Sequence, residues 1–157
     1  MTSVTMFTLT AVAAIGSGLI GGIFFAFSTF VMAALRRLPA AQGIAAMQSI
    51  NVAVLNPWFL GPFFGTAAVG AVLAVMALLR SGRGDAWLLA GGALYIVGTV
   101  AVTILFNVPR NRALAAVAPH GADGARLWAD YAISWTAWNH VRTAASVAAS
   151  AAFIAAL

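Results

Sequence analysis

The sequence contains no cysteine, no lysine and no glutamate, and its only acidic residues are Asp85, Asp123 and Asp130. Without cysteine, the chain can form no disulfide, thiolate metal site or iron–sulfur cluster. Because no predicted membrane span contains a carboxylate, the sequence argues against a proton-relay transporter, a carboxylate di-iron centre and paired-carboxylate catalysis. The two histidines, His120 and His140, are too few for most metal sites, so no metal is expected.

Apolar residues dominate what is present. They make up 63% of the 157 residues, whereas charged residues make up 7%. A soluble domain carries about a quarter charged residues, so this composition indicates a membrane protein. The net charge of +5 comes from arginines at the ends of apolar runs. That placement is typical of topology signals and not of nucleic-acid binding.

Four apolar runs are long enough to cross a bilayer, which requires about 20 residues. These runs cover residues 6–35, 57–79, 86–108 and 134–157. The first run lacks the basic start of a signal peptide and is interpreted as a retained span. The sequence therefore predicts a single all-α domain over residues 1–157, an integral membrane protein with an antiparallel bundle of four transmembrane helices.

The connections between these runs differ in length and charge. Residues 40–55 predict a short interfacial helix between the first two spans, and residues 110–133 predict one or two short helices around a break at Pro119-His120-Gly121. Residues 81–85 predict a tight turn. The first and third connections hold more arginines than the second, so they are expected in the cytoplasm. The expected location is a bacterial inner (plasma) membrane.

The antiparallel topology brings polar residues together at one end of the bundle. The residues concerned are Ser28, Thr29, Gln48, Asn51, Asn56, Asn107, Asn111, Asn139, His140 and Arg142. In the fourth span, helical spacing places one set of residues on a single face, with His140 at its edge and well away from Arg142. The residues of this face are Trp135, Asn139, Arg142, Thr143 and Ser146. A polar stripe in a membrane span is expected to face the bundle interior.

Structural roles can also explain these residues one by one. Asn56, directly before Pro57, fits a helix N-cap. Asn107 can satisfy backbone carbonyls that a nearby proline leaves free, and Trp135 and Trp138 fit the aromatic belt at the head-group level. Arg142 can extend towards the interface from a shallow depth. These alternatives remain open beside a functional site.

As a site, the same residues fit stabilisation of an enolate or phenolate better than hydrolysis. Arg142 and Asn139 are expected to stabilise an anion in a low-dielectric pocket. His140 is the candidate base. Aromatic side chains would pack a flat aromatic substrate. The residues expected to bind that substrate are Asn51, Asn107, Asn111, Trp135 and Trp138.

Four stretches, GGIFFAFSTFVMAAL, SINVAVLNPWF, FNVPRNRAL and WTAWNHVRT, follow one another along the chain. In this order they resemble the anthrone oxygenase-like family of small four-helix membrane proteins, many bacterial members of which are known only as a domain of unknown function. The family's N-x-P-x-N pattern falls on Asn107, Pro109 and Asn111. Its W-x-x-W-N-x-x-R pattern falls on residues 135–142.

The resemblance implies an oxygenase that converts an anthrone to an anthraquinone with molecular oxygen and no metal or flavin cofactor. The predicted function is a cofactor-independent oxygenase or oxidase of an aromatic, lipophilic substrate, and a quinone-like ligand stays open. The alternatives are a non-catalytic small-molecule-binding or accessory membrane protein and, third, a haem protein ligated by His140. A homo-oligomer is also left open.

Overall fold

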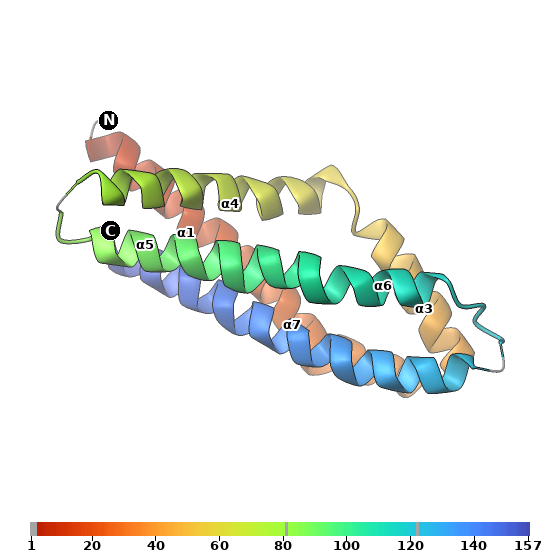
Figure 1. The fold of residues 1–157 in the computed structure, drawn as a ribbon. Helices are drawn as coiled ribbons and strands as arrows, with labels where there is room; N and C mark the ends of the chain where they lie inside the picture. The colour runs from red at the N-terminus through yellow and green to blue at the C-terminus, as the bar shows by residue number, and fades with distance from the viewer. Residues whose placement is uncertain (1–2, 81, 122) are drawn as a thin grey trace.

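The computed structural model describes residues 3–80, 82–121 and 123–157, and over these residues the regular structure is entirely helical (Figure 1). The first half of the chain holds α1 (Ser3–Ala26), the π-helical turn η1 (Phe27–Val31), α2 (Met32–Leu35), α3 (Ala40–Ala53) and α4 (Pro57–Leu78). The second half holds α5 (Asp85–Ala93), the π-helical segments η2 (Leu94–Ala101) and η3 (Thr103–Asn107), α6 (Val108–Ala115) and α7 (Gly124–Ala155).

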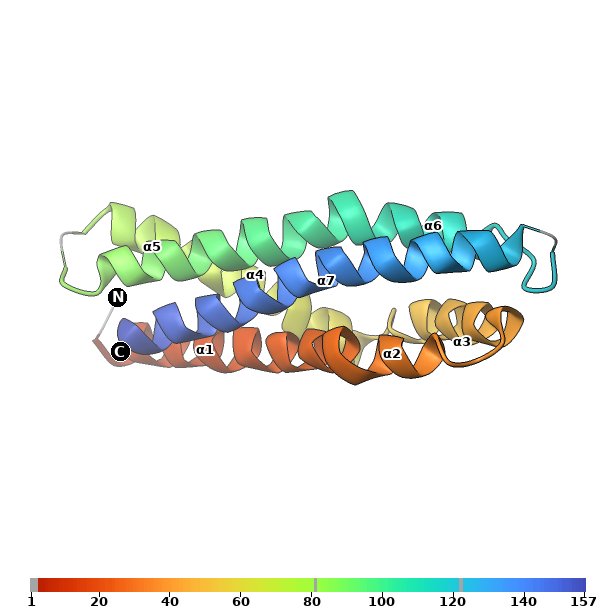
Figure 2. The ribbon, with the colours of Figure 1, turned by 90° about the horizontal axis from the view of Figure 1, so that it is seen from below.

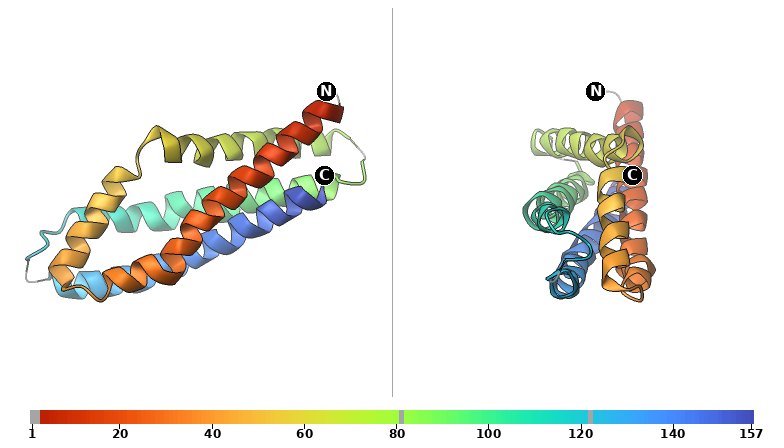
Figure 3. Two further views of the ribbon diagram at one scale, coloured as in Figure 1. Left: turned by 180° about the vertical axis from the view of Figure 1, so that it is seen from behind. Right: turned by 90° about the vertical axis from the view of Figure 1, so that its right-hand side faces the viewer.

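The helices lie along one long axis. The α4–α5 connection, the start of α1 and the C-terminus lie at one end of the molecule, and α3 and the α6–α7 connection lie at the other (Figures 1 and 3). Helix α1 packs against α4 and α7, and α5 packs against the same two helices. Figure 2 shows α1 and α7 side by side at the end that carries the C-terminus.

Three helical segments are long and apolar enough to cross a membrane, namely Ser3–Leu35, Pro57–Leu78 and Asp85–Ala115. This finding agrees with the first three predicted spans. The predicted fourth span lies within α7, which is not among these segments because its tryptophans, Asn139, His140 and Arg142 lower its hydropathy. The sequence therefore predicts one apolar span more than the structure supports by length and composition.

The connections follow the sequence more closely. Helix α3 confirms the predicted short helix between the first two spans, and its place at a membrane interface stays a prediction. Asn56 is the N-cap of α4, as predicted, because its Oδ1 accepts a hydrogen bond of 3.1 Å from the Phe59 backbone N–H. The break near Pro119 is also present. The helices beside it are not separate short helices, because α6 continues directly from η3 and α7 begins at Gly124 and runs to Ala155.

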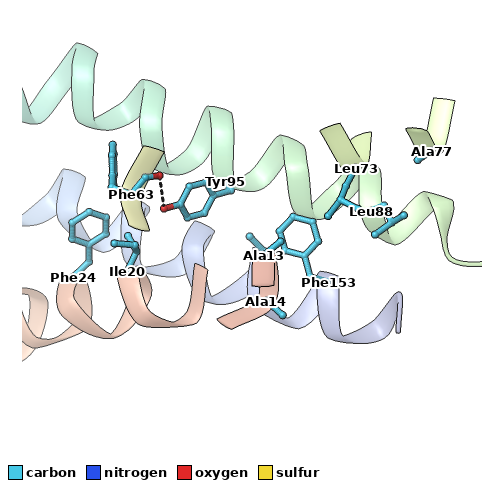
Figure 4. Packing of buried hydrophobic residues seen from close by; sticks show 11 residues of the cluster. Ala13, Ala14, Ile20, Phe24, Phe63, Leu73, Ala77, Leu88, Tyr95 and Phe153 are labelled. Atoms are coloured by element: carbon cyan, nitrogen blue, oxygen red, sulfur yellow. Dashed lines mark hydrogen bonds between the residues drawn. The ribbon is translucent and has the colours of Figure 1, made fainter. Parts of the chain in front are cut away.

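The half of the molecule nearest the termini has a closely packed apolar core. Its buried members are Ala13, Ala14, Ile20, Phe24, Phe63, Leu73, Ala77, Leu88, Tyr95, Ala149 and Phe153 (Figure 4). The Tyr95 hydroxyl is satisfied there by donating to the Phe63 carbonyl at 3.1 Å. Helices α4 and α5 meet at Gly70 and Gly92, where an added Cβ on Gly92 would lie 2.9 Å from the Gly70 carbonyl oxygen. Small residues thus permit direct backbone contact.

A second apolar core holds α3 against α7 at the opposite end. Its buried members are Met32, Ile44, Met47, Leu114, Trp128, Tyr131, Ala132 and Trp135. The two cores are separate clusters, and residues of both border the cavity described next. The fold therefore leaves a space between two packed regions.

Candidate functional site

A cavity of about 340 Å³ lies between the two cores. It is walled by α1, α4, the end of α3, η3, α6 and α7. Most of its lining is apolar, and the polar residues in the lining are Asn51, Thr103, Asn107, Asn111 and Arg142. A mainly apolar cavity with a few convergent polar groups is the usual form of a small-molecule site.

The cavity brings together residues from distant parts of the sequence. Five of the eight predicted site residues line it, namely Asn51, Asn107, Asn111, Trp135 and Arg142. The sequence therefore identified the segments that meet around the cavity. Because the lining comes from several helices, the site exists only in the folded chain.

The other three predicted site residues lie outside the lining. Asn139 is fully buried and contacts Arg142. Trp138 is half-buried and stacks on Phe106, with ring centroids 3.6 Å apart. His140 is exposed, so the candidate base and proposed haem ligand lies away from the cavity.

Arg142 is the charged group of the cavity, and it is only 4% exposed. Its guanidinium donates to Thr103 Oγ1 at 3.2 Å and to Asn139 Oδ1 at 2.6 Å. The guanidinium carbon also lies 4.1 Å from the centroid of the Phe24 ring and 5.1 Å from that of Trp135. These contacts fix the side chain by hydrogen bonding and by cation–π attraction.

The groups that hold Arg142 are all neutral. Its Nε is buried and has no hydrogen-bond partner among the described residues. A guanidinium stays protonated under ordinary conditions, and a buried charge without a counterion is costly. Arg142 is therefore suited to bind an anionic or electron-rich oxygen inside the cavity.

Asn139 positions Arg142 from outside the cavity lining. Its Nδ2 donates to the Phe24 carbonyl and to Ser28 Oγ, both at 2.7 Å, while its Oδ1 accepts from Arg142. The Ser28 hydroxyl also pairs with Thr143 Oγ1 at 3.0 Å. The amide of Asn139 thus joins α7 to the end of α1 and orients the guanidinium, and both of its N–H donors are used.

Asn107 keeps one atom unused. Its side chain is 1% exposed, and its Nδ2 donates to the Trp135 carbonyl at 3.2 Å. Since a carbonyl only accepts, this bond sets the orientation of the amide and leaves Oδ1 without a partner in the described residues. The alternative interpretation was that Asn107 binds a carbonyl that the proline frees within its own helix. The observed bond is different, because the Trp135 carbonyl belongs to α7.

The proline of the N-x-P-x-N motif is accommodated locally. Pro109 stands at the start of α6, directly after the π-helical segment η3. The Arg110 guanidinium donates to the Phe106 carbonyl at 2.7 Å. A π-helical turn before a proline avoids the steric conflict that a regular helix would meet. This arrangement lets the helix continue, so that residues 107 and 111 both reach the cavity.

Asn111 closes the cavity at the α3 end. Its Oδ1 accepts from the Tyr131 hydroxyl at 3.0 Å and from Trp135 Nε1 at 2.8 Å. Asn51 also lines the cavity, and its Nδ2 has no partner of hydrogen-bonding geometry among the described residues.

Sequence reasoning missed three residues that shape the site. Thr103 holds Arg142, Phe24 supports it with its ring, and Tyr131 binds Asn111. A helical spacing of four residues relates Thr103 to Asn107 and Tyr131 to Trp135, so both were detectable as extensions of the predicted polar faces. Phe24 carried no such signal, because its contact depends on how α1 packs on α7.

The chemistry of the cavity follows from these groups. Across the described ranges of the chain, no three His, Cys, Asp or Glu side chains come together. The polar groups in the lining are amides, a hydroxyl and a guanidinium, which can bind and stabilise an oxygen atom carrying negative charge.

Comparison with known protein families identifies a match. The sequence model of the family described as anthrone oxygenase matches residues 58–152, which is more than half of the chain. The matched segment contains the N-x-P-x-N and W-x-x-W-N-x-x-R motifs. No curated protein and no solved structure matches the chain.

Proposed function

The chain belongs to the anthrone oxygenase family, and from this premise we propose that it oxidises a lipophilic aromatic compound inside a membrane. The observation that carries this proposal is Arg142, a buried cation with only neutral partners in the lining of a largely apolar cavity. The substrate would be an anthrone or a related aromatic ketone, and molecular oxygen would be the co-substrate. No metal or organic cofactor takes part in the proposed reaction.

The proposed membrane arrangement includes α7 as a fourth span of an antiparallel bundle. In support, the polar side chains Asn139, Arg142 and Ser146 are buried inside the molecule. Within residues 134–157, the exposed residues are apolar except for His140, and they include Val141, Val147 and Ile154. A helix of low mean hydropathy can cross a bilayer when its polar groups face the bundle interior. We place the protein in a bacterial inner membrane, with the first and third connections on its cytoplasmic side.

The proposed reaction begins with loss of a proton from the methylene carbon of the substrate. The resulting enolate oxygen binds the Arg142 guanidinium, which is held in place by Thr103 and Asn139. A preorganised cation in a low-dielectric site stabilises the developing charge and so favours proton loss to water. Because the enolate is electron-rich, it can transfer electrons to oxygen directly.

The overall change balances with molecular oxygen alone. The methylene carbon loses both of its hydrogens and forms a double bond to one oxygen atom. The second oxygen atom takes up these two hydrogens and leaves as water. The substrate is oxidised to the quinone and oxygen is reduced. The roles of Asn51, Asn107 and Asn111 are to position the substrate, and Trp135 packs against its ring.

Turnover of anthrone by the purified protein in nanodiscs tests this proposal. Oxygen consumption and anthraquinone formation are expected above the spontaneous rate. Arg142→Met removes the cation while retaining a long side chain, and it is expected to lower turnover by about 10- to 100-fold. Arg142→Lys should retain part of the activity. A folded Arg142→Met variant with full turnover, or a wild-type protein with no turnover, contradicts the oxygenase proposal.

A non-catalytic binding function is the second candidate. It is favoured by the position of His140, because the predicted base is exposed and neither His120 nor His140 lines the cavity. The same cavity would then bind a phenol or a quinone-like compound without turnover. Arg142-dependent binding of 2-naphthol, together with an unchanged rate of anthrone oxidation, would support this function over the oxygenase.

A further inference from the structure

The boundary of the cavity contains a set of apolar residues that are more than half exposed. Leu55 is 68% exposed, Phe64 is 51% exposed and Ile104 is 53% exposed, and all three also line the cavity. A residue that is both a lining residue and an exposed residue marks the place where the cavity meets the surroundings. The mouth of the cavity therefore lies between the beginning of α4 and η3, and it is apolar.

Two of the polar lining residues are almost fully buried. Asn107 is 1% exposed and Arg142 is 4% exposed, although both line the same cavity. The lining therefore shows a gradient of burial from the exposed apolar residues at the mouth to Asn107 and Arg142, with Asn51, Thr103 and Asn111 at intermediate exposure. A ligand that matches this gradient has an apolar body and one oxygen at its inner end.

The α3 end of the molecule offers a different surface. A groove there is lined by charged residues, including Arg110, Asp123, Arg126 and Asp130, and by Tyr131. Between this groove and the cavity, the hydrogen bonds from Tyr131 and Trp135 to Asn111 form a wall. The second apolar core packs behind this wall. The charged groove is therefore separated from the cavity.

Phe64 and Ile104 belong to two of the segments that are long and apolar enough to cross a membrane. Their exposed sides are expected to contact lipid chains rather than water. We propose that the ligand enters and leaves the cavity sideways from the hydrocarbon layer, between α4 and η3, with Phe64 and Ile104 as the portal residues. This inference rests on the proposed membrane arrangement and on Arg142-dependent binding.

The portal limits which compounds reach Arg142. A slender apolar ring system with a single hydroxyl or carbonyl oxygen dissolves in the bilayer and can pass between two apolar side chains. A compound with a permanent charge partitions into water and meets the charged groove, which is closed towards the cavity. The portal thus selects lipophilic compounds by their route of entry, before Arg142 selects them by their oxygen.

The rates of 2-naphthol binding to the protein in nanodiscs test the portal, with the probe's own fluorescence as the signal. Ile104→Trp narrows the entrance, and both the association and dissociation rates are expected to fall about tenfold while the equilibrium affinity changes little. Phe64→Ala widens the entrance and is expected to raise both rates. A parallel change in both rates distinguishes a passage from a binding contact.

Matched controls are available on the same helices. Leu105→Trp introduces the same bulk at a residue that is 63% exposed and does not line the cavity. Val75→Ala is the control for truncation in α4, at an exposed residue that also lies outside the lining. Both controls should bind at wild-type rates. Ile104→Phe serves as a milder narrowing variant if Ile104→Trp fails to fold. A water-soluble analogue, 6-hydroxynaphthalene-2-sulfonate, is expected to associate at least about tenfold more slowly.

The outcomes separate the portal from the proposed function. If 2-naphthol binds in an Arg142-dependent manner but Ile104→Trp or Ile104→Phe binds at wild-type rates, the portal is wrong and the binding site stands. Rapid binding of the sulfonate would also contradict lateral entry. If the wild-type protein shows no Arg142-dependent binding of 2-naphthol, the binding site on which the portal rests is wrong, and the portal fails with it, whereas anthrone turnover tests the oxygenase separately.

Discussion

The two halves of the molecule use the same helices in opposite ways. Near the termini, α4 and α5 meet with direct backbone contact at Gly70 and Gly92, and Phe153 fills the space beside them. Towards α3, the same long helices surround a cavity of about 340 Å³. One half is closed by small residues, whereas the other is kept open by large aromatic and amide side chains.

This difference separates stability from function. Among the described residues of the closed half, no buried side-chain nitrogen or oxygen lacks a hydrogen-bond partner, and the Tyr95 hydroxyl, for example, donates to the Phe63 carbonyl. In the open half, Arg142 Nε and Asn107 Oδ1 are buried without partners among the described residues. Unpaired buried polar atoms are costly, and they persist where a ligand completes them. The open half is therefore the one whose buried polar atoms are available to a ligand.

The largest expected effect comes from forcing the closed half apart. Gly92→Ala places a methyl group 2.9 Å from the Gly70 carbonyl oxygen, which is backbone and cannot rotate away. The helices must separate, so the free energy of unfolding should fall by about 1–3 kcal/mol. Thermal unfolding in detergent measures this change.

Gly65→Ala is the matched control in α4, because nothing described lies within 4 Å of its added Cβ. It should leave stability unchanged or raise it by up to about 1 kcal/mol, through better helix propensity. If both variants unfold at the wild-type temperature, direct backbone contact is not what holds the closed half together.

The next effect separates the two halves by function. Asn139→Ala removes three hydrogen bonds and releases Arg142, so stability should fall by about 1–2 kcal/mol and affinity for 2-naphthol by about tenfold. Tyr95→Phe removes one bond in the closed half and should lower stability alone. Unfolding and equilibrium binding are measured for both variants. Equal loss of binding in the two would show that affinity simply follows stability.

A smaller effect is expected from closing the open half. Val108 lines the cavity and is half-buried, so Val108→Phe should fill part of it and raise stability by about 0.5–1 kcal/mol. Binding of 2-naphthol should be lost, because the ligand and the new ring compete for the same space. Val97→Phe, at an exposed residue outside the lining, should change neither property. Unchanged binding in Val108→Phe would place the ligand elsewhere.

Sequence reasoning predicted those parts of the fold that depend on local pattern. Composition predicted an all-helical membrane protein, and helical spacing placed Trp135 and Arg142 in the interior, where the structure has them. Their convergence with Asn107 followed from the assumed order of the helices. Each of these inferences needs only periodicity and chain direction.

The remaining features depend on contacts between helices. The bond from Arg142 to Thr103 requires a specific register of α7 against η3, which no spacing within one helix determines. The same is true of the bond from Asn139 to the Phe24 carbonyl. The sequence also predicted a fourth apolar span where α7 is a mixed helix, because Asn139, His140 and Arg142 lower the hydropathy of this segment below that of an apolar span.

The smallest expected effect concerns His140. Successive residues of an α-helix are rotated by about 100°, so His140 points about 200° away from Arg142 on α7. No small rotation of α7 can bring His140 into the cavity while Arg142 stays there, and in the structure His140 is exposed. Anthrone turnover and 2-naphthol binding by His140→Ala should therefore stay within about twofold of wild type. A loss of tenfold or more, in a variant that unfolds at the wild-type temperature, would restore His140 as the base. The cavity mapped around Arg142 would then not be where the proton is removed.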